Sequence, residues 1–150
     1  MRPMTARAMQ MMAMAATAVV LAMFGGCKDG GAAESAAWYR IDAKELTLAP
    51  GAEGAAQVRF IPRNGYHWNP EFPARLKVSD AGSVKASKVD FSLSNGDFLD
   101  EGGTGALTIP IAAQAAGATA LKGLADFSVC NDKECRIFKQ IAVEVPIDVH

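Results

Sequence analysis

The chain has 150 residues, enough for one compact domain; half of its residues are hydrophobic and 21% are charged. Its 15 Lys and Arg residues are balanced by 16 Asp and Glu residues. This composition is typical of a globular protein, and the absence of a Lys/Arg run argues against a nucleic-acid-binding surface.

The first 26 residues have the pattern of an export signal. Arg2 and Arg7 form a short positive region before an apolar stretch at residues 8–24. The motif Phe24-Gly25-Gly26-Cys27 resembles the bacterial lipobox, in which the Cys is lipidated and becomes the new N-terminus. We therefore expect residues 1–26 to be a lipoprotein signal peptide. An uncleaved anchor, or an ordinary signal with an incidental Cys, is the alternative.

The segment after the expected cleavage site is small and polar. Cleavage would leave 13 basic and 16 acidic residues, a net charge of −3. We expect residues 27–37 to comprise the lipidated Cys27 and a flexible tether, because Gly, Ala and Ser dominate there. Lys28 in place of Asp favours the outer membrane over the inner one, by resemblance to the enterobacterial sorting rule. The predicted location is the cell envelope, facing the periplasm and anchored in its lipid bilayer.

Residues 38–149 have the pattern of one all-β domain. Runs of alternating polar and apolar residues are separated by Gly, Pro and Asn. The expected strands are 38–41, 46–48, 55–61, 74–78, 84–91, 108–114, 121–130 and 137–149. Short strands with frequent turns predict a β-sandwich. We expect Pro110 at an edge or a bulge, because it has no amide hydrogen for a neighbouring strand.

Cys130 and Cys135 are the side-chain thiols that remain after lipidation of Cys27. Outside the cytoplasm, two thiols within reach of each other are usually paired. The residues between them, Asn131-Asp132-Lys133-Glu134, read as a turn, so the cysteines would face each other across a hairpin. Cross-strand Cα separations of about 4.5–5.5 Å lie within the disulfide range of about 4.4–6.8 Å.

The pattern leaves the purpose of this bond open. It would close a loop of about six residues, for which chain entropy gives a stabilisation of about 2 kcal/mol. This small value favours redox use, and an inert structural bond is the alternative. Lys133 and Arg136 would lower a thiol pKa, whereas Asp132 and Glu134 would raise it.

Two segments resemble a known family. The stretch LTIPIAAQAAGATALKGLADFSVCNDKECRIFKQIAVEVPI, residues 107–147, is similar to the N-terminal periplasmic domain of the thiol:disulfide interchange protein DsbD. The stretch GYHWNPEFPARLKV, residues 65–78, resembles segments of the same domains. The resemblance implies an immunoglobulin-like β-sandwich whose two cysteines carry reducing equivalents between membrane and periplasmic thioredoxin-like proteins.

Carried onto this chain, the resemblance makes Cys130 and Cys135 the catalytic redox pair. It also places Phe98, within residues 94–100, on a cap loop that shields the disulfide; a core or loop-packing Phe is the alternative. The cysteine spacing is one residue shorter than in the best-known member, and Arg136-Ile137-Phe138 replaces an aromatic-proline segment. No counterpart of the family's transmembrane and thioredoxin-like domains is present, so electrons would come from a separate protein.

Few other residues suggest chemistry. His67 is a possible auxiliary proton donor or metal ligand, or simply a histidine hydrogen-bonded in a loop. Together with Cys130 and Cys135 it would suit Cu(I) or Zn, but no compact ligand spacing is present and we expect no metal. Residues 102–105 lack the Lys-Ser/Thr of a phosphate-binding loop, and we expect no cofactor. Two functions remain for a monomeric protein: thiol–disulfide exchange, or binding and scaffolding with a structural disulfide.

Overall fold

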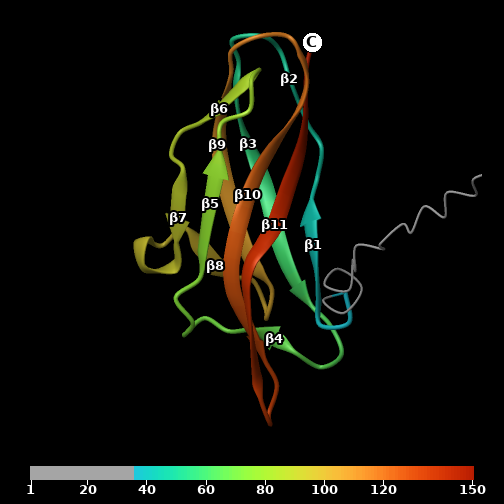
Figure 1. The fold of residues 1–150 in the computed structure, drawn as a ribbon, viewed down its shortest axis with the longest axis vertical. Coiled ribbons are helices and arrows are strands. Elements are labelled where there is room, and N and C mark those ends of the chain that lie inside the picture. Colours follow the sequence, from blue (N-terminus) through green and yellow to red (C-terminus); the bar gives the residue numbers. More distant parts are fainter. Residues whose placement is uncertain (1–35) are drawn as a thin grey trace, which may run out of the picture.

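The structure, a computed structural model, describes residues 36–150. The predicted signal peptide and Cys27 lie outside the described residues. Two β-sheets pack face to face into an elongated sandwich (Figure 1). Within residues 36–150, no helix is long and apolar enough to cross a membrane.

The first sheet has five antiparallel strands. Its order is β1 (Tyr39–Ala43), β3 (Glu53–Pro62), β9 (Gly105–Ala113) and β6 (Val84–Ala86), and β8 (Phe98–Asp100) also pairs with β9. Because β6 and β8 pair with different parts of β9, the edge of this sheet is shared between two short strands.

The second sheet has six strands. Its order is β2 (Leu46–Leu48), β11 (Cys135–Val149), β10 (Gly117–Cys130), β5 (Arg75–Ser79) and β7 (Asp90–Ser92), and β4 (His67–Trp68) also pairs with β10. The β2–β11 pair is parallel and the other pairs are antiparallel. A single turn of 3₁₀ helix, η1 (Leu93–Asn95), connects β7 towards β8.

The core lies between the inner faces of the two sheets. Alternate residues point inward, as in β3, where Ala56, Val58 and Phe60 are buried and their neighbours are not. Towards one end the core is aromatic: the Trp68 ring stacks on Phe127, with centroids 5.9 Å apart. This arrangement confirms the immunoglobulin-like β-sandwich that the sequence predicts.

The strand prediction missed two short strands and merged two others into one. The structure adds β4 and β8, which are too short to show a period of two. The single run expected at residues 84–91 is in fact β6 and β7, which belong to different sheets. Residues 87–89 between them are all exposed and cross from one sheet to the other, so a continuous strand there is excluded.

The expectation for Pro110 was wrong. Pro110 lies in β9, an inner strand, opposite Ala55 of β3. It is tolerated because β8 pairs with β9 up to Leu107 and β6 pairs only from Ile111, which leaves a gap between them. The Pro110 carbonyl accepts the Ser87 amide on this side, so the ring nitrogen also faces the gap and no strand hydrogen bond is lost.

The longest element is the β10–β11 hairpin, which carries both cysteines to one end of the sandwich (Figure 1). Its strands are paired from Gly117–Val149 to Cys130–Cys135, with one register shift between Ala125 and Phe127. At this shift Gln140 adopts a positive φ of 55°, and its amide donates to the Asp126 carboxylate at 2.8 Å. A bulge of this kind bends and twists a hairpin.

Candidate functional site

The turn that joins the two cysteine-bearing strands is ordered by Asn131. Its amide donates to the Glu134 carbonyl at 2.9 Å, as expected for a tight hairpin turn. Its side-chain oxygen accepts the amides of Lys133 and Glu134, both at 2.8 Å. An Asn side chain that bonds the following backbone in this way stabilises a turn locally. The turn therefore fixes the register that places Cys130 opposite Cys135.

Cys130 and Cys135 form the disulfide that the sequence predicts. The bond joins directly paired residues, with an S–S distance of 2.02 Å and a Cα–Cα distance of 4.0 Å. Their separation is somewhat shorter than the 4.5–5.5 Å typical of cross-strand pairs. Because directly opposed side chains leave a sheet on the same face, the bond lies on the outer face of the second sheet.

The two cysteines differ in exposure. Cys130 is 8% exposed, since β10 is flanked by β11 on one side and by β4 on the other. Cys135 is exposed, because β11 has no described partner strand on its outer side until Ile147. A protein approaching the disulfide therefore meets Cys135 first.

His67 lies next to the disulfide. In the β4–β10 pair His67 is directly opposite Cys130, so the side chains of His67, Cys130 and Cys135 leave the sheet on the same face from three adjacent strands. His67 is exposed, whereas the next residue, Trp68, is fully buried in the core. The structure thus places His67 next to the cysteine pair that the sequence predicts.

Ser128 and Ile137 continue this outer face, and the sequence did not identify them. Ser128 is two residues before Cys130 and is only 1% exposed, and its hydroxyl has no hydrogen-bond partner among the described residues. Ile137 pairs with Ser128 and is 56% exposed. An exposed apolar residue beside Cys135 gives the disulfide an apolar border on its open side.

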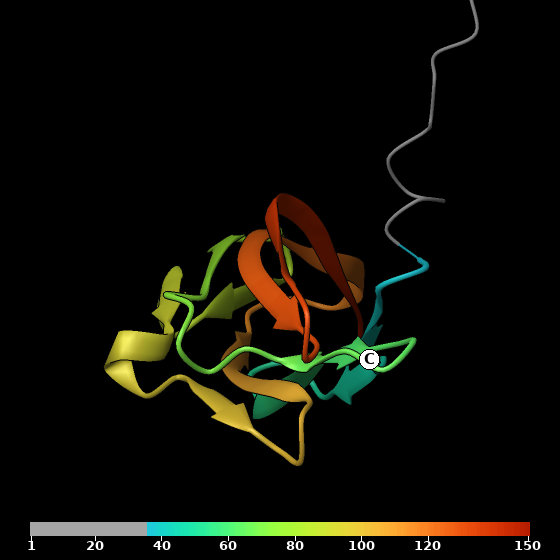
Figure 2. The same ribbon diagram turned by 90° about the horizontal axis from the view of Figure 1, so that it is seen from below.

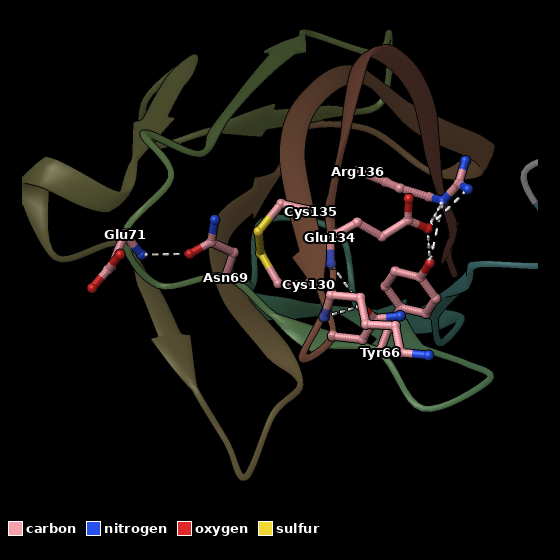
Figure 3. The surroundings of a disulfide bond; sticks show 9 residues. Tyr66, Asn69, Glu71, Cys130, Glu134, Cys135 and Arg136 are labelled. Carbon is pink, nitrogen blue, oxygen red and sulfur yellow. Dashed lines mark hydrogen bonds and ion pairs between the residues drawn. A yellow bond between two sulfur atoms is a disulfide. The ribbon is translucent and has the colours of Figure 1, made fainter.

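A second cluster, formed by Tyr66, Glu134 and Arg136, lies on the other face of the hairpin. The hydroxyl of Tyr66 donates to the Glu134 carboxylate, and Arg136 donates from Nε to the same carboxylate at 3.1 Å and to the Tyr66 hydroxyl at 3.3 Å. Figure 3 shows these three side chains converging on one side of the disulfide, with Asn69 on the other. The guanidinium of Arg136 also covers the ring of Trp38. This cluster connects the hairpin to the first turn of the domain.

The charges of this cluster largely satisfy one another. The hydrogen bond from Tyr66, followed by that from Arg136, lowers the pKa of Glu134 below its usual value of 4.5. The same partners, with Tyr66 again the larger cause, raise the pKa of Arg136. The two charged residues that flank Cys135 in the chain are therefore paired with each other, with Arg136 Nη2 2.9 Å from Glu134 Oε1.

Phe98 lies in the core. It is 4% exposed, and its ring stacks on Trp68 with centroids 5.7 Å apart and packs against Phe60 at 6.0 Å. This is the position that the alternative interpretation, a core-packing Phe, expects. Trp68 belongs to β4, the strand that flanks Cys130, so Phe98 packs against that strand from the core side.

The outer face of the second sheet also holds a hollow of about 780 Å³ between β5, β7, β10 and β11. Its lining mixes charges of both signs, with Arg75, Lys122, Asp126 and Glu144 among them, and it includes neither cysteine. Within residues 36–150, no group of three or more His, Cys, Asp or Glu side chains is arranged to hold a metal ion.

Comparisons with known proteins show only distant structural likeness. No family model and no curated protein matches the chain. Similar solved structures include WR4, a Caenorhabditis elegans MSP family member, with 10% identity, a TM-score of 0.42 and coverage of 76% of this chain and 99% of that one. A cohesin–dockerin complex of Clostridium thermocellum has 11% identity, a TM-score of 0.42 and coverage of 75% and 99%. A PapD-like domain of human CEP192 has 13% identity, a TM-score of 0.29 and coverage of 76% and 86%.

Proposed function

We propose that the chain is a cell-envelope lipoprotein, anchored through Cys27, that exchanges electrons with thioredoxin-like or membrane thiol:disulfide proteins through Cys130 and Cys135. One observation carries the proposal: the disulfide joins a buried Cys130 to an exposed Cys135 at the turn end of a long hairpin. The resemblance to the DsbD N-terminal domain supports the same function. The lipobox-like motif supports an envelope location, and Lys28 after the Cys favours the outer membrane.

In the proposed thiol–disulfide exchange, the partner attacks Cys135 because Cys135 is exposed and Cys130 is buried. A thiolate of a dithiol partner attacks Sγ of Cys135, the S–S bond breaks, and Cys130 leaves as a thiolate that takes up a proton. The partner's second thiolate then attacks the partner sulfur of the mixed disulfide, and Cys135 is released and protonated. Two electrons and two protons pass to this chain, and the partner becomes a disulfide. The reverse sequence oxidises this chain and reduces the next disulfide protein.

The surrounding structure supports redox use in another way. The β10–β11 hairpin is paired from Gly117–Val149 to Cys130–Cys135 apart from one bulge at Asp126, and the turn is already fixed by Asn131. A bond that spans five positions of such a hairpin adds little restraint to the chain. The disulfide can therefore open and close while the sandwich keeps its shape.

A second function is a binding or scaffold module in which the disulfide is structural. The bonded cysteine pair in an immunoglobulin-like sandwich fits this function as well. The specific observation in its favour is the hollow of about 780 Å³ on the outer face of the second sheet. Neither cysteine is among the residues that line it. Ligand pockets in proteins commonly have volumes of about 300–1,000 Å³.

The reduction potential of the Cys130–Cys135 pair tests the two functions. The fraction of disulfide would be measured by mass spectrometry across glutathione and dithiothreitol buffers. Exchange predicts a potential of roughly −120 to −270 mV, the range of exchange proteins, whereas a value below about −300 mV marks a structural bond. In the second case the binding module replaces the exchange function.

A further inference from the structure

The first described residues pack directly against the cysteine hairpin. The ring of Trp38 lies under the guanidinium of Arg136, 3.8 Å from ring centroid to Cζ, and meets Tyr66 edge-on at 5.2 Å. Two further bonds secure the preceding turn: Arg63 donates to the Ala36 carbonyl at 3.2 Å, and the Asn64 side-chain amide donates to the carbonyl of residue 37. The chain therefore enters the domain beside the residue that follows Cys135.

The fold places the two ends of the domain far apart. β1 begins at the same end of the sandwich as β4 and the hairpin turn, and the C-terminus is at the other end (Figure 1). Figure 2 looks at the first of these ends, where the green segment with β4 lies between the hairpin and the loop that follows β8. β11 alone runs for 15 residues, about 50 Å at 3.3 Å per residue.

The length of chain before this point limits how far the hairpin can lie from a lipid anchor. Nine residue steps separate Cys27 from Ala36, and a fully extended chain covers about 30 Å in that number of steps. A flexible Gly-rich segment of this length has a root-mean-square span of about 15–18 Å. An anchored Cys27 would thus keep the Cys130–Cys135 bond near the bilayer and leave the opposite end of the sandwich free to lie much farther away.

We propose that the hairpin end of the domain faces the membrane that holds Cys27, and that it docks a membrane-embedded protein whose reactive thiols open at that bilayer surface. This inference rests on the lipid anchoring in the proposed function. A soluble domain of about 100 residues is roughly 34 Å across, which exceeds the usual span of the tether. The exposed Ile137 beside Cys135 supplies an apolar contact for such a partner.

The orientation is tested with the full-length, lipidated chain in phospholipid vesicles that carry a maleimide on a small fraction of lipid headgroups. Cys130→Ser leaves Cys135 free to react. The comparison protein carries Cys130→Ser, Cys135→Ser and Ala116→Cys, which moves the thiol to an exposed turn at the opposite end. Each rate is divided by the rate with soluble N-ethylmaleimide. We expect a normalised rate about tenfold higher for Cys135, because tethering raises its effective concentration at the bilayer.

A longer tether supplies the second arm of the test. Inserting about 30 Gly/Ser residues after Lys28 should bring the two normalised rates close together, since the span of a flexible chain grows with its length. Equal rates for the two positions with the native tether would overturn the orientation. Absence of acyl chains on the N-terminal peptide, or failure to float with vesicles, would instead refute the anchoring in the proposed function.

The choice of a membrane partner has its own measurement. Reduced soluble thioredoxin would be mixed with the vesicle-bound, disulfide-bonded wild-type chain, with either the native or the lengthened tether. We expect the native tether to slow this reaction severalfold relative to the lengthened one, because a soluble protein has little clearance at the bilayer. Equal rates would show that soluble partners reach Cys135 freely and would overturn the membrane-embedded partner. The reduction potential is measured separately, so a structural disulfide remains distinguishable from a wrong orientation.

Discussion

The guanidinium of Arg136 lies 3.8 Å from the centre of the Trp38 ring. Through this contact the first turn of the domain touches the strand that begins at Cys135. Arg136 also donates to Tyr66, so its side chain connects the hairpin with two segments that are distant in sequence, those of Trp38 and Tyr66. The disulfide consequently lies at an end of the sandwich that these contacts hold in place. A partner of the proposed exchange would approach it from the exposed outer face.

The first prediction concerns the unequal exposure of the cysteines. Cys130→Ser leaves the exposed Cys135, and Cys135→Ser leaves Cys130, which is 8% exposed. We expect Cys135 to react with a chromogenic aromatic disulfide on the order of tenfold faster than Cys130, because thiol reactivity depends on access. Stopped-flow absorbance at one pH gives both rates. Similar rates would contradict Cys135 as the point of attack, and denatured samples of both variants serve as the control for intrinsic reactivity.

The second prediction concerns the stability that the disulfide supplies. The double variant Cys130→Ala/Cys135→Ala should remain folded and lose about 2 kcal/mol of unfolding free energy, as expected for a short closed loop. Urea unfolding followed by Trp fluorescence measures the change, and wild-type protein in excess dithiothreitol should give a similar value. Complete loss of the folded state would mean that the bond holds the sandwich together, which favours the binding-module function.

The third prediction uses the pH dependence of Glu134. Hydrogen bonds from Tyr66 and then Arg136 lower the pKa of Glu134 in the folded state. A carboxylate with a lowered pKa stabilises the fold above its unfolded pKa, and this contribution is lost as the pH falls through the folded value. We therefore expect Glu134→Gln to lower the melting temperature at pH 7 and to have a progressively smaller effect as the pH falls below 4.5.

The matched control for Glu134→Gln is Glu53→Gln. Glu53 is exposed on β3 and makes no ion pair within residues 36–150. The melting temperature of the Glu53→Gln variant should match that of the wild type at every pH. A pH-independent loss in the Glu134 variant would show that the cluster acts through shape rather than through the carboxylate charge.

The fourth prediction concerns the part of the core where Gly105 packs against Trp68 of β4. A Cβ at Gly105 would lie within 2.7 Å of three ring atoms of Trp68, which is fully buried. We expect Gly105→Ala to cost about 1–3 kcal/mol, the range for overpacked cores. Gly82→Ala is the control, because a Cβ there meets no atom within 4 Å. Denaturant unfolding of the two variants compares them, and equal stability would show that the Trp68 ring can move aside.

Several features could be predicted from sequence because they depend on local pattern. Period-two alternation in residues 55–61 and 74–78 predicts strands, and the structure has β3 and β5 there. The four-residue turn between Cys130 and Cys135 predicts a hairpin, and the two cysteines are indeed paired and bonded. Side-chain direction along a strand follows from neighbouring residues alone, so these elements need no knowledge of the rest of the chain.

The tertiary structure decided everything that depends on contacts between distant segments. Tyr66 and Glu134 are 68 positions apart, and no local pattern predicts that they bond. β4 has only two residues, so only its pairing with β10 reveals that His67 lies beside Cys130. Phe98 could equally have been a loop or a core residue, and its place was decided by the space beside Trp68. These positions depend on close packing among residues from the whole core, so they cannot be predicted from a short stretch of sequence.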